Sequence, residues 1–443
     1  MSKVDEMLRA MQARGTVIEP IVSGMEGNRA VAVGICHEED LPGRQLQVAD
    51  RLSRVLDSIF FSETPGVIPN HSVANDVASL FDSPAAFAFL GIIRGGLIAA
   101  RDSLGLKPLY WGRDGNGDYG FASLIAPLIT VGIADPKPIG PGQVIDLLGS
   151  SPQVSVTHVL AKPAQIAVME DEAVEKLGTM LLKAVSTMVP EGSGLAFSGG
   201  VDSALIATAC RKVGLNPQLI TVGMTGQPEL QHAKQAAKDI GLPIVIEPLN
   251  EDKVLKAAPT VAQTVETKSP VTLGISLPFH FACQQARGLG LKSIVVGQLS
   301  DELFGGYARF EETALKEGTA QADMAMWNSV LAAAEGDFAP GDKVATSFGL
   351  ELRCPFAYLP LAKFALELPV NLRIKISAGT IVRKYLLRRL GEKWDLPSYI
   401  VNRPKKAFQY SSGVQKVLVK DARRTRRRLG EFILQPASEG GPS

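Results

Sequence analysis

Several features that would point to other classes of protein are scarce in this chain of 443 residues. It has only four cysteines, at isolated positions, so no Cys-x-x-Cys pair exists for zinc or redox chemistry and reduced, buried thiols are expected. Its five histidines do not cluster, which argues against a histidine metal site. The formal net charge is +1, so no overall charge draws the chain to nucleic acid or to an anionic membrane.

Long apolar runs are also missing. No stretch is apolar over the length needed to span a bilayer, and the amphipathic start of the chain carries both charge signs, unlike a signal peptide. We therefore expect a cytoplasmic protein with neither a nucleic-acid nor a membrane partner. Hydrophobic residues make up 46% and charged residues 21%, as in ordinary globular proteins, and the length allows two or three domains.

Two patterns divide the chain. Residues 1–150 contain short apolar runs broken by Gly, Pro, Asn and Asp, which is typical of a β-rich domain, with a helix-like stretch around 52–60. The Ser-, Pro- and Val-rich stretch 150–165 is interpreted as a linker. The last residues, 431–443, are expected to be a flexible tail.

The second pattern, over 168–430, alternates strands with helices. It begins with a helical face, which consists of Val174, Leu177, Leu181, Val185 and Met188. Apolar runs that predict strands then follow, each before a helical segment: GLAFS, LITVGM, LPIVIEPL and SIVVG. This alternation predicts a parallel sheet covered on both faces. From about Glu311 the pattern predicts mostly helix.

The run LAFSGGVDS, between a predicted strand and a predicted helix, is the strongest single signal. Gly199 and Gly200 let the backbone N–H groups approach a phosphate, Ser198 and Ser203 add hydroxyl donors, and the helix start adds positive charge. Asp202 would repel a phosphate, so its carboxylate makes sense as a ligand of Mg²⁺. The run lacks the lysine of the common NTPase loop and resembles the loop of the ATP pyrophosphatases. That resemblance implies a grip on the β,γ-pyrophosphate and cleavage of ATP at the α-phosphorus. The alternative, a plain Gly-Ser turn, fits this context less well.

A second loop, VGQLSDELFGGY, follows the fourth predicted strand. Ligands of open parallel sheets lie beyond the carboxyl ends of the strands, so this loop is expected on the same rim as the first. Asp301 is then the natural second ligand for Mg²⁺ beside Asp202. A solvated turn is the alternative.

With DELFGGY downstream of SGGVDS, the chain resembles the asparagine synthetase family. SFGLELRCPF, VRKYLLRR and NRPKKAFQY resemble later segments of that family. The resemblance implies that Lys405 reaches the α-phosphate and the leaving pyrophosphate, and that Lys384 and Arg388 belong to the family's Lys-x-x-Leu-Arg helix. It also implies an adenosine pocket, lined by Ala196, Val222, Val296 and Gly297.

The first third resembles the family's glutaminase domain, chiefly through RDSLGLKPLYW. In the family that domain uses a cysteine at its own N-terminus as nucleophile, whereas this chain begins Met1-Ser2-Lys3, and Cys36 is interpreted as a core residue. We therefore expect a truncated Ntn-like α+β domain over 1–150, without glutaminase activity. The synthetase domain expected over 168–430 is a parallel-sheet, adenine-nucleotide α-hydrolase-like (PP-loop) α/β domain.

The second loop departs from the family at one position. Where asparagine synthetases have a glutamate near the acyl-adenylate, this chain has Gln298, which can orient a substrate but cannot take a proton near neutral pH. Either another base stands in, with Glu302 and Glu351 as the candidates, or the enzyme relies on the free NH₃ present in solution. We assign catalytic roles to Lys405, Gln298 and Glu302.

The resemblance implies a carbon–nitrogen ligase that uses ATP and Mg²⁺. It would activate aspartate or a related acid as an acyl-adenylate for attack by ammonia, in a chain that can form a homodimer. Two alternatives stay open. One is an amide ligase or cyclase for another acid, similar to β-lactam synthetases. The other, of a different class, is a catalytically silent regulatory or scaffold homologue.

Overall fold

The computed structural model describes residues 18–23, 31–36, 86–93, 96–146, 153–155, 161–377, 380–405 and 408–425. The chain divides into two compact units, 1–161 and 162–443, with the division inside the stretch interpreted as a linker. The helix predicted around 52–60 and the tail 431–443 lie outside the described residues.

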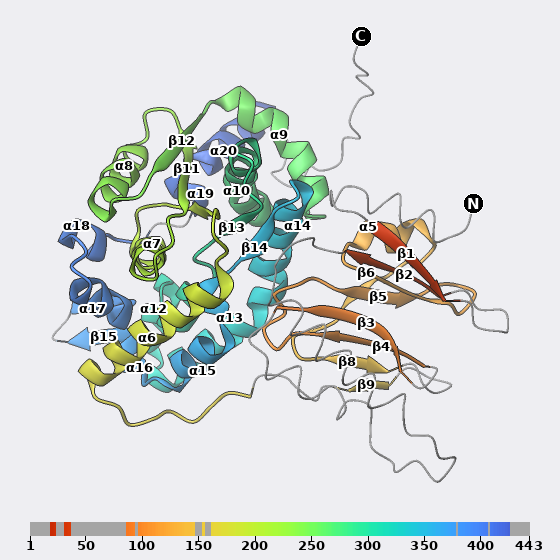
Figure 1. The fold of residues 1–443 in the computed structure, drawn as a ribbon, viewed down its shortest axis with the longest axis horizontal. Helices are drawn as coiled ribbons and strands as arrows, with labels where there is room; N and C mark the ends of the chain where they lie inside the picture. Colours follow the sequence, from red (N-terminus) through yellow and green to blue (C-terminus); the bar gives the residue numbers. More distant parts are fainter. Residues whose placement is uncertain are drawn as a thin grey trace. The chain divides into compact units, whose positions relative to one another are not determined.

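The first unit is rich in β-strands, as its sequence pattern predicts, and its described strands pair antiparallel (Figure 1). Its described sheets have the orders β1-β2, β3-β4-β8-β9 and β6-β5-β7. The elements are β1 (Ile18–Ser23), β2 (Val31–Cys36), β3 (Ala88–Ile93), β4 (Gly96–Arg101), β5 (Tyr110–Arg113), β6 (Tyr119–Ala122), α5 (Ile125–Thr130), β7 (Lys137–Pro138), β8 (Val144–Asp146) and β9 (Gln153–Ser155). Strand β9 lies in the predicted linker, so the linker prediction was wrong there: backbone pairing with β8 makes these residues part of the sheet.

The turn after β4 is held together by two buried charged residues. The Arg101 guanidinium donates to the carbonyl of Ile139 (2.8 Å) and to two carbonyls of the turn itself. The Asp102 carboxylate accepts the backbone N–H groups of Leu104 (3.0 Å) and Leu106 (2.9 Å). In the described residues, RDSLGLKP therefore acts as a structural turn, in which each buried charge meets backbone groups of opposite polarity.

The second unit contains a five-stranded parallel sheet of order β12-β11-β10-β13-β14, which confirms the predicted parallel α/β fold. Its strands are β10 (Gly194–Ala196), β11 (Gln218–Met224), β12 (Ile244–Leu249), β13 (Ser293–Val295) and β14 (Glu351–Arg353). The chain runs outward from β10 to β12 and then returns to the other side of β10. The strand order therefore reverses between β10 and β13, and the loops that follow these two strands diverge around a crevice.

Helices cover both faces of this sheet (Figure 1). Helices α7 and α8 lie on one face, and α6 and α17 pack against the side of α7 that is turned away from the sheet. Helix α10 covers the other face, together with α9, α14 and α20. The helices of the first part of this unit are α6 (Glu170–Met188), α7 (Val201–Lys212), α8 (Pro228–Ile240), α9 (Glu251–Thr264), α10 (Pro270–Gly288), α11 (Ser300–Phe304), α12 (Ala308–Lys316) and α13 (Thr319–Ala333). All five residues of the predicted apolar face of α6 are buried.

The C-terminal part is mostly helical, as predicted, but not entirely. Strand β14 and the hairpin of β15 (Ile374–Ser377) and β16 (Thr380–Arg383) lie within it. Polar Glu351 and Arg353 flank the single buried leucine of β14, so no apolar run marks this strand. The remaining elements are the π-helix η2 (Ala334–Phe338), α14 (Ala339–Ser347), the 3₁₀-helix η3 (Pro355–Ala357), α15 (Leu359–Glu367), α16 (Val370–Arg373), α17 (Tyr385–Lys393), α18 (Ser398–Val401), α19 (Phe408–Ser411) and α20 (Val414–Thr425).

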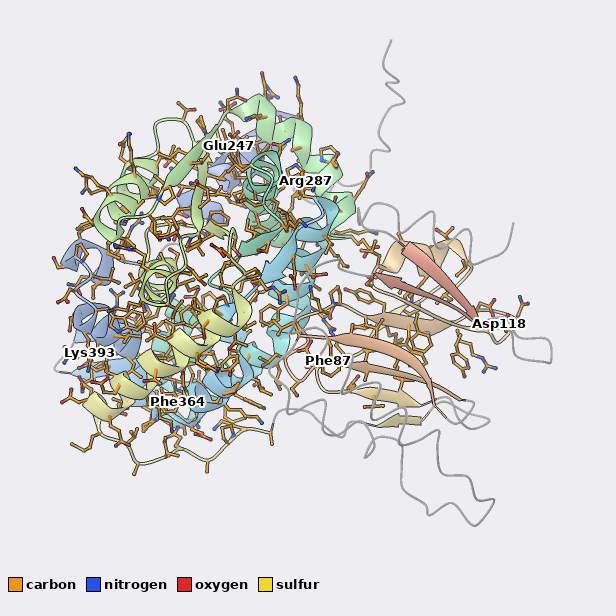
Figure 2. The ribbon with its side chains drawn as sticks, viewed as in Figure 1. Phe87, Asp118, Glu247, Arg287, Phe364 and Lys393 are labelled. Atoms are coloured by element: carbon orange, nitrogen blue, oxygen red, sulfur yellow. The ribbon has the colours of Figure 1, made fainter. Side chains whose placement is uncertain are left out.

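Side-chain packing in this unit combines apolar contacts with a few satisfied charges (Figure 2). Phe364 of α15 is buried, with the Lys176 ammonium 4.6 Å from the centre of its ring. Glu247 on the edge strand β12 is buried as well, and it accepts hydrogen bonds from Lys253 and from Gln285 of α10 (2.5 Å). The first contact joins α15 to α6, and the Glu247 contacts tie α9 and α10 to the sheet whose carboxyl rim carries the site.

Candidate active site

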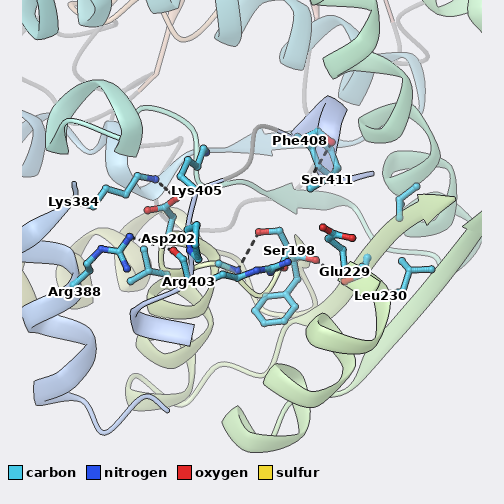
Figure 3. A pocket seen from close by; sticks show the side chains of 16 residues that line it. Ser198, Asp202, Glu229, Leu230, Lys384, Arg388, Arg403, Lys405, Phe408 and Ser411 are labelled. Carbon is cyan, nitrogen blue, oxygen red and sulfur yellow. Dashed lines mark hydrogen bonds and ion pairs between the residues drawn. The ribbon is translucent and has the colours of Figure 1, made fainter. Parts of the chain in front are cut away.

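A pocket lies at the carboxyl ends of β10 and β11 and encloses about 690 Å³, counted out to its open mouth. Figure 3 shows that its two ends differ in chemistry. Three cationic side chains gather around Asp202 at one end; they are Lys384, Arg388 and Lys405. The Arg403 side chain extends from there to Ser198, in the middle of the pocket. The other end is formed by Glu229, Leu230, Phe408 and Ser411. The pocket therefore offers one end to a polyanion and the other to a flat, largely apolar group.

The first loop closes one wall of the cationic end. Gly199 has φ +68°, a conformation that favours glycine, and Gly200 precedes the first residue of α7. The Ser198 N–H donates to Ser203 Oγ (3.4 Å), which itself donates to the Gly200 carbonyl (3.2 Å). These bonds fix the turn so that Ser198, Gly200 and Asp202 line the pocket at a helix N-terminus.

The second loop meets the first, as the strand order requires. Gly297 packs against Asp202: a Cβ on Gly297 would lie 3.4 Å from the Asp202 Cβ. Leu299 then takes an unusual left-handed conformation (φ 72°) and starts the short helix α11, which carries Asp301 and Glu302. The expectation that the two loops share one rim is therefore confirmed.

Asp202 and Asp301 are bridged by Lys384, whose side chain is only 2% exposed. The Lys384 ammonium pairs with Asp202 and lies 2.7 Å from Asp301 Oδ1, while Lys405 Nζ donates to Asp301 Oδ2 (2.5 Å). Burial alone would raise the pKa of Asp301, but the two lysines outweigh burial and hold it well below its usual range. Burial would likewise lower the pKa of Lys405, and Asp301 and Asp202 raise it instead. Asp301 and Lys405 therefore stay charged near neutral pH.

Lys384 reaches this position through a strained backbone. It has φ 56° and ψ 37° at the start of α17, and its N–H donates to the Phe304 carbonyl (3.1 Å). Gly306 makes room for it, because a Cβ there would overlap both Asp301 Oδ1 and Lys384 Cε. A left-handed lysine costs about 1–2 kcal/mol, and such strain is typical of functional positions.

Glu302 lies behind the pocket rather than in its wall. It accepts a hydrogen bond from the Tyr307 hydroxyl (2.5 Å) and is 3% exposed. Burial, with Asp337 and Asp301 nearby, raises the pKa of Glu302 to about 7. Burial and the charge of Asp301 raise the pKa of Asp337 to about 6. The acidic side of the site, formed by Glu302 and Asp337, thus contains two carboxyl groups that gain or lose a proton near neutral pH. Asp337 lies in a π-helix, an irregularity that is frequent at functional sites.

Gln298 contacts the same π-helix. Its Nε2 donates to the Asp337 carbonyl (3.0 Å), and its Oε1 accepts from the Cys354 thiol (3.6 Å). Gly341 packs against the amide, because a Cβ there would lie 3.2 Å from Gln298 Nε2. The side chain is therefore oriented by partners on three segments, outside the set of residues that line the pocket.

These contacts predict a pH-dependent cost for Gln298→Glu. An ionised carboxylate cannot donate to the Asp337 carbonyl, so the introduced acid has a folded-state pKa above its unfolded value of about 4.3. As pH rises, the introduced carboxyl therefore loses its proton at a lower pH in the unfolded state than in the folded state. The free energy of unfolding then falls as pH rises from about 4.3 toward the folded-state pKa. We expect little loss at pH 4.5 and about 1–3 kcal/mol at pH 8, measured by urea denaturation. Gln321→Glu, at an exposed position, is the matched control. If Gln298→Glu lost the same stability at both pH values, the hydrogen bond from Gln298 to the Asp337 carbonyl would not be the cause of the loss.

The residues predicted to line the adenosine pocket divide into two groups. Val222 of β11 lines the pocket. Ala196 at the end of β10, and Val296 and Gly297 after β13, lie on the same rim but do not belong to the set that lines it. Gly199, Ser203, Gln298, Asp301 and Glu302 also lie outside that set, although Ser203 supports the loop and Asp301 holds Lys405.

Sequence reasoning did not assign site roles to Arg403, Phe408, Tyr307 or Asp337. Arg403 Nη1 donates to the Ser198 carbonyl (2.8 Å), so the C-terminal segment is fastened to the first loop. Three of them stand in segments that the sequence singles out: Arg403 and Phe408 begin and end the RPKKAF segment that contains Lys405, and Tyr307 ends the second loop. Asp337 has no such signal, because its place in the site depends on packing between segments that are distant in the sequence.

The donor set suits Mg²⁺ that arrives with a nucleotide. Oδ1 of Asp202 is buried and has no hydrogen-bond partner in the described structure, which leaves a carboxylate oxygen for a cation. The described residues contain no cluster of three or more Asp, Glu, His or Cys side chains that would hold a metal alone. Mg²⁺ usually binds through one or two carboxylates and substrate phosphates, so Asp202 and Asp301 fit this ion.

Comparison with known families agrees with this geometry. The model of the asparagine synthase family matches residues 180–326 and 314–431, together more than half of the chain. The chain belongs to the asparagine synthase family. The match covers both loops and the C-terminal segments that bring Lys384 and Lys405 to them.

The individual relatives of this asparagine synthase family member share less than a third of their residues with it over the aligned lengths. A provisionally named asparagine synthetase of Methanocaldococcus jannaschii is 29% identical over 296 residues, 59% of this chain and 54% of that protein. The glutamine-hydrolysing asparagine synthetase 1 of Arabidopsis thaliana is 29% identical over 368 residues, 76% of this chain and 59% of that protein. The chain thus spans a little over half the length of these relatives.

Among solved structures, the NMN synthetase of Francisella tularensis aligns with 61% of this chain and 100% of its own, at 14% identity and a TM-score of 0.31. A score this low adds nothing to the fold that the strand order establishes. In the described part of the chain, no helix combines the length and apolarity that crossing a membrane requires.

Proposed function

We propose that this chain is an ATP-dependent, AMP-forming amide ligase. The observation that carries the proposal is the buried cluster in which Lys384 and Lys405 meet Asp202 and Asp301, at the mouth of a Gly-rich loop. Such a cluster is arranged for a polyphosphate and the cation it brings. A silent scaffold would have no use for the buried Lys384 on a strained backbone, with the half-buried Lys405 beside it, since a buried charge and backbone strain each cost stability.

In the proposed first step, a carboxylate oxygen of the acid attacks the α-phosphorus of ATP. A bond forms between that oxygen and phosphorus, and the bond from phosphorus to the α,β-bridging oxygen breaks, so pyrophosphate leaves. Lys405 would face the α-phosphate and the leaving group, where negative charge builds, and the N–H groups of Gly199 and Gly200 would hold the β- and γ-phosphates. Mg²⁺ held by Asp202 and Asp301 would neutralise phosphate charge.

In the second step, ammonia would attack the acyl carbon of the adenylate and AMP would leave with its phosphate oxygen. The attacking nitrogen must lose a proton, and Glu302 and Glu351 are our candidates to accept it. Glu302 would first have to leave the Tyr307 hydroxyl, which holds it outside the pocket wall. Gln298 would orient the acid rather than move a proton, because a neutral amide cannot act as a base. Aspartate is our first candidate acid. The change from glutamate to Gln298 favours a related acid as the second.

The products test this proposal. Purified protein with ATP, Mg²⁺, ammonium and a set of carboxylic acids that starts with aspartate should release AMP and pyrophosphate in equal amounts, and only when the right acid is present. Chromatography of the nucleotides with a coupled pyrophosphate assay measures both. ADP and phosphate as products would rule out cleavage at the α-phosphorus. Glutamine in place of ammonium should not support turnover if the first unit lacks glutaminase activity.

A further inference from the structure

His232 on α8 packs against Gly199 of the Gly-rich loop and is not among the residues that line the pocket. Its Nε2 is 2.8 Å from the Gly199 carbonyl oxygen. That oxygen can only accept, so the proton of the contact is on Nε2 and the ring donates. The approach is tight as well, because a Cβ on Gly199 would lie 2.8 Å from His232 Cδ2 and 3.2 Å from the Ala233 Cα.

The contact sets the direction of one peptide group. All described peptide bonds are trans, so the Gly199 carbonyl and the Gly200 N–H point in opposite directions. With the carbonyl held by His232, the Gly200 N–H faces away from α8, toward Ser198 Oγ (3.3 Å) in the pocket wall. Two adjacent glycines have little steric preference of their own, so this group would otherwise be free to rotate and present its carbonyl to a bound anion.

His232 is itself held in place. The ring of Tyr399 on α18 packs edge-on against it, with centroids 5.4 Å apart and an interplanar angle of 88°. The Tyr399 hydroxyl donates to Asp239 (2.5 Å), near the other end of α8. The same helix α18 leads to Arg403, which holds the neighbouring carbonyl of Ser198. Burial lowers the pKa of His232, so the ring is a neutral donor at pH 7.

We propose that His232 is a positioning residue for polyphosphate: by holding the Gly199 carbonyl outward, it keeps the Gly200 N–H directed at the phosphates of a nucleotide or of pyrophosphate. The inference rests on the proposed function only for the identity of the ligand. His232 touches the loop and not the pocket, so it acts through Gly200. Its loss leaves the other end of the pocket, where the flat group binds, unchanged.

The test compares three substitutions that differ in donor reach. His232→Gln places an amide N–H near the position of Nε2, His232→Asn has the same amide one bond shorter, and His232→Leu keeps bulk without a donor. His280→Leu is the control, since His280 is a second half-buried helix histidine packed edge-on against aromatic rings, on α10. Calorimetry with Mg²⁺ gives the Kd of each protein for inorganic pyrophosphate, ATP and adenosine, and thermal melts confirm folding.

We expect His232→Leu and His232→Asn to bind pyrophosphate and ATP about tenfold more weakly, the loss of about one hydrogen bond. His232→Gln should stay within about threefold of the wild type, His280→Leu should be unchanged, and adenosine should bind equally to all. If His232→Leu fails to fold, the Asn and Gln pair decides. If His232→Asn and His232→Gln bound pyrophosphate equally well, or if adenosine binding weakened along with pyrophosphate binding, the role of His232 would be overturned and the proposed function would stand. A wild type that binds neither ATP nor pyrophosphate would overturn the proposed function as well.

Discussion

Replacing Asp301 by asparagine is expected to lower acid-dependent pyrophosphate release at least about 100-fold. Asp301 accepts Lys405 (2.5 Å) and lies 2.7 Å from the Lys384 ammonium. The amide of asparagine has no charge and turns an NH₂ group toward one of the lysines. Lys405 would then lose the partner that fixes it, and the cation would lose a ligand. The loss of one preorganised electrostatic group typically costs 10²- to 10³-fold in rate.

The stability of the same variant separates chemistry from folding. Removal of one partner of a buried ion pair costs about 3–5 kcal/mol, so Asp301→Asn should also unfold at lower urea concentration. Asp202→Asn leaves Lys405 paired and should lose activity with a smaller loss of stability. Asp135→Asn breaks an exposed ion pair with Lys137 and should change neither. Activity of folded Asp301→Asn within tenfold of the wild type would show that Asp301 holds neither the cation nor Lys405 in the working enzyme.

The first loop, with Gly199 and Gly200, could be predicted from the sequence because its signal is local. A buried strand, two glycines and a helix start stand within a few residues of each other, and glycine at a positive φ is a property of the chain itself. The neighbouring position of the second loop also followed from the sequence, since the strands of a parallel sheet direct their carboxyl ends to one rim.

The rest of the site depends on contacts that no local pattern contains. Lys384 meets Asp202 across 182 residues of sequence, and its strained φ of 56° has no sequence signature, unlike a glycine. The Tyr307 hydroxyl turns Glu302 away from the pocket, and Asp337 joins it through a π-helix. On the acidic side, Glu302 was therefore identifiable from the sequence, but Asp337, the contact with Tyr307 and the protonation of the two carboxyl groups were not.

The acidic side of the site and its cationic end are held by one short segment. Helix α11 carries Asp301 toward the lysines and Glu302 toward Tyr307, and the two glycines that follow it end the helix at once. Gly306 N–H donates to the Asp301 carbonyl (2.8 Å), and the Gly306 carbonyl accepts from Arg383 Nη1 (3.1 Å). This backbone is fixed on both sides, so it cannot move to make room for a side chain.

Gly306→Ala is therefore expected to be the most damaging change of a single methyl group. The methyl would overlap Asp301 Oδ1 and Lys384 Cε, which are themselves an ion pair, and one of the two must leave its place. Either movement separates Lys384 from Asp301 and disturbs the proposed cation site. We expect pyrophosphate release to fall by about 10³-fold and stability by about 1–3 kcal/mol, the usual cost of overpacking.

Gly288→Ala provides the matched control, because a Cβ there meets nothing within 4 Å and its φ is not positive. It adds the same methyl group at the end of α10 and should leave activity unchanged while stability stays level or rises by up to about 1 kcal/mol. Wild-type turnover by folded Gly306→Ala would mean that Lys384 and Asp301 separate during catalysis, and that their contact belongs to the free enzyme alone.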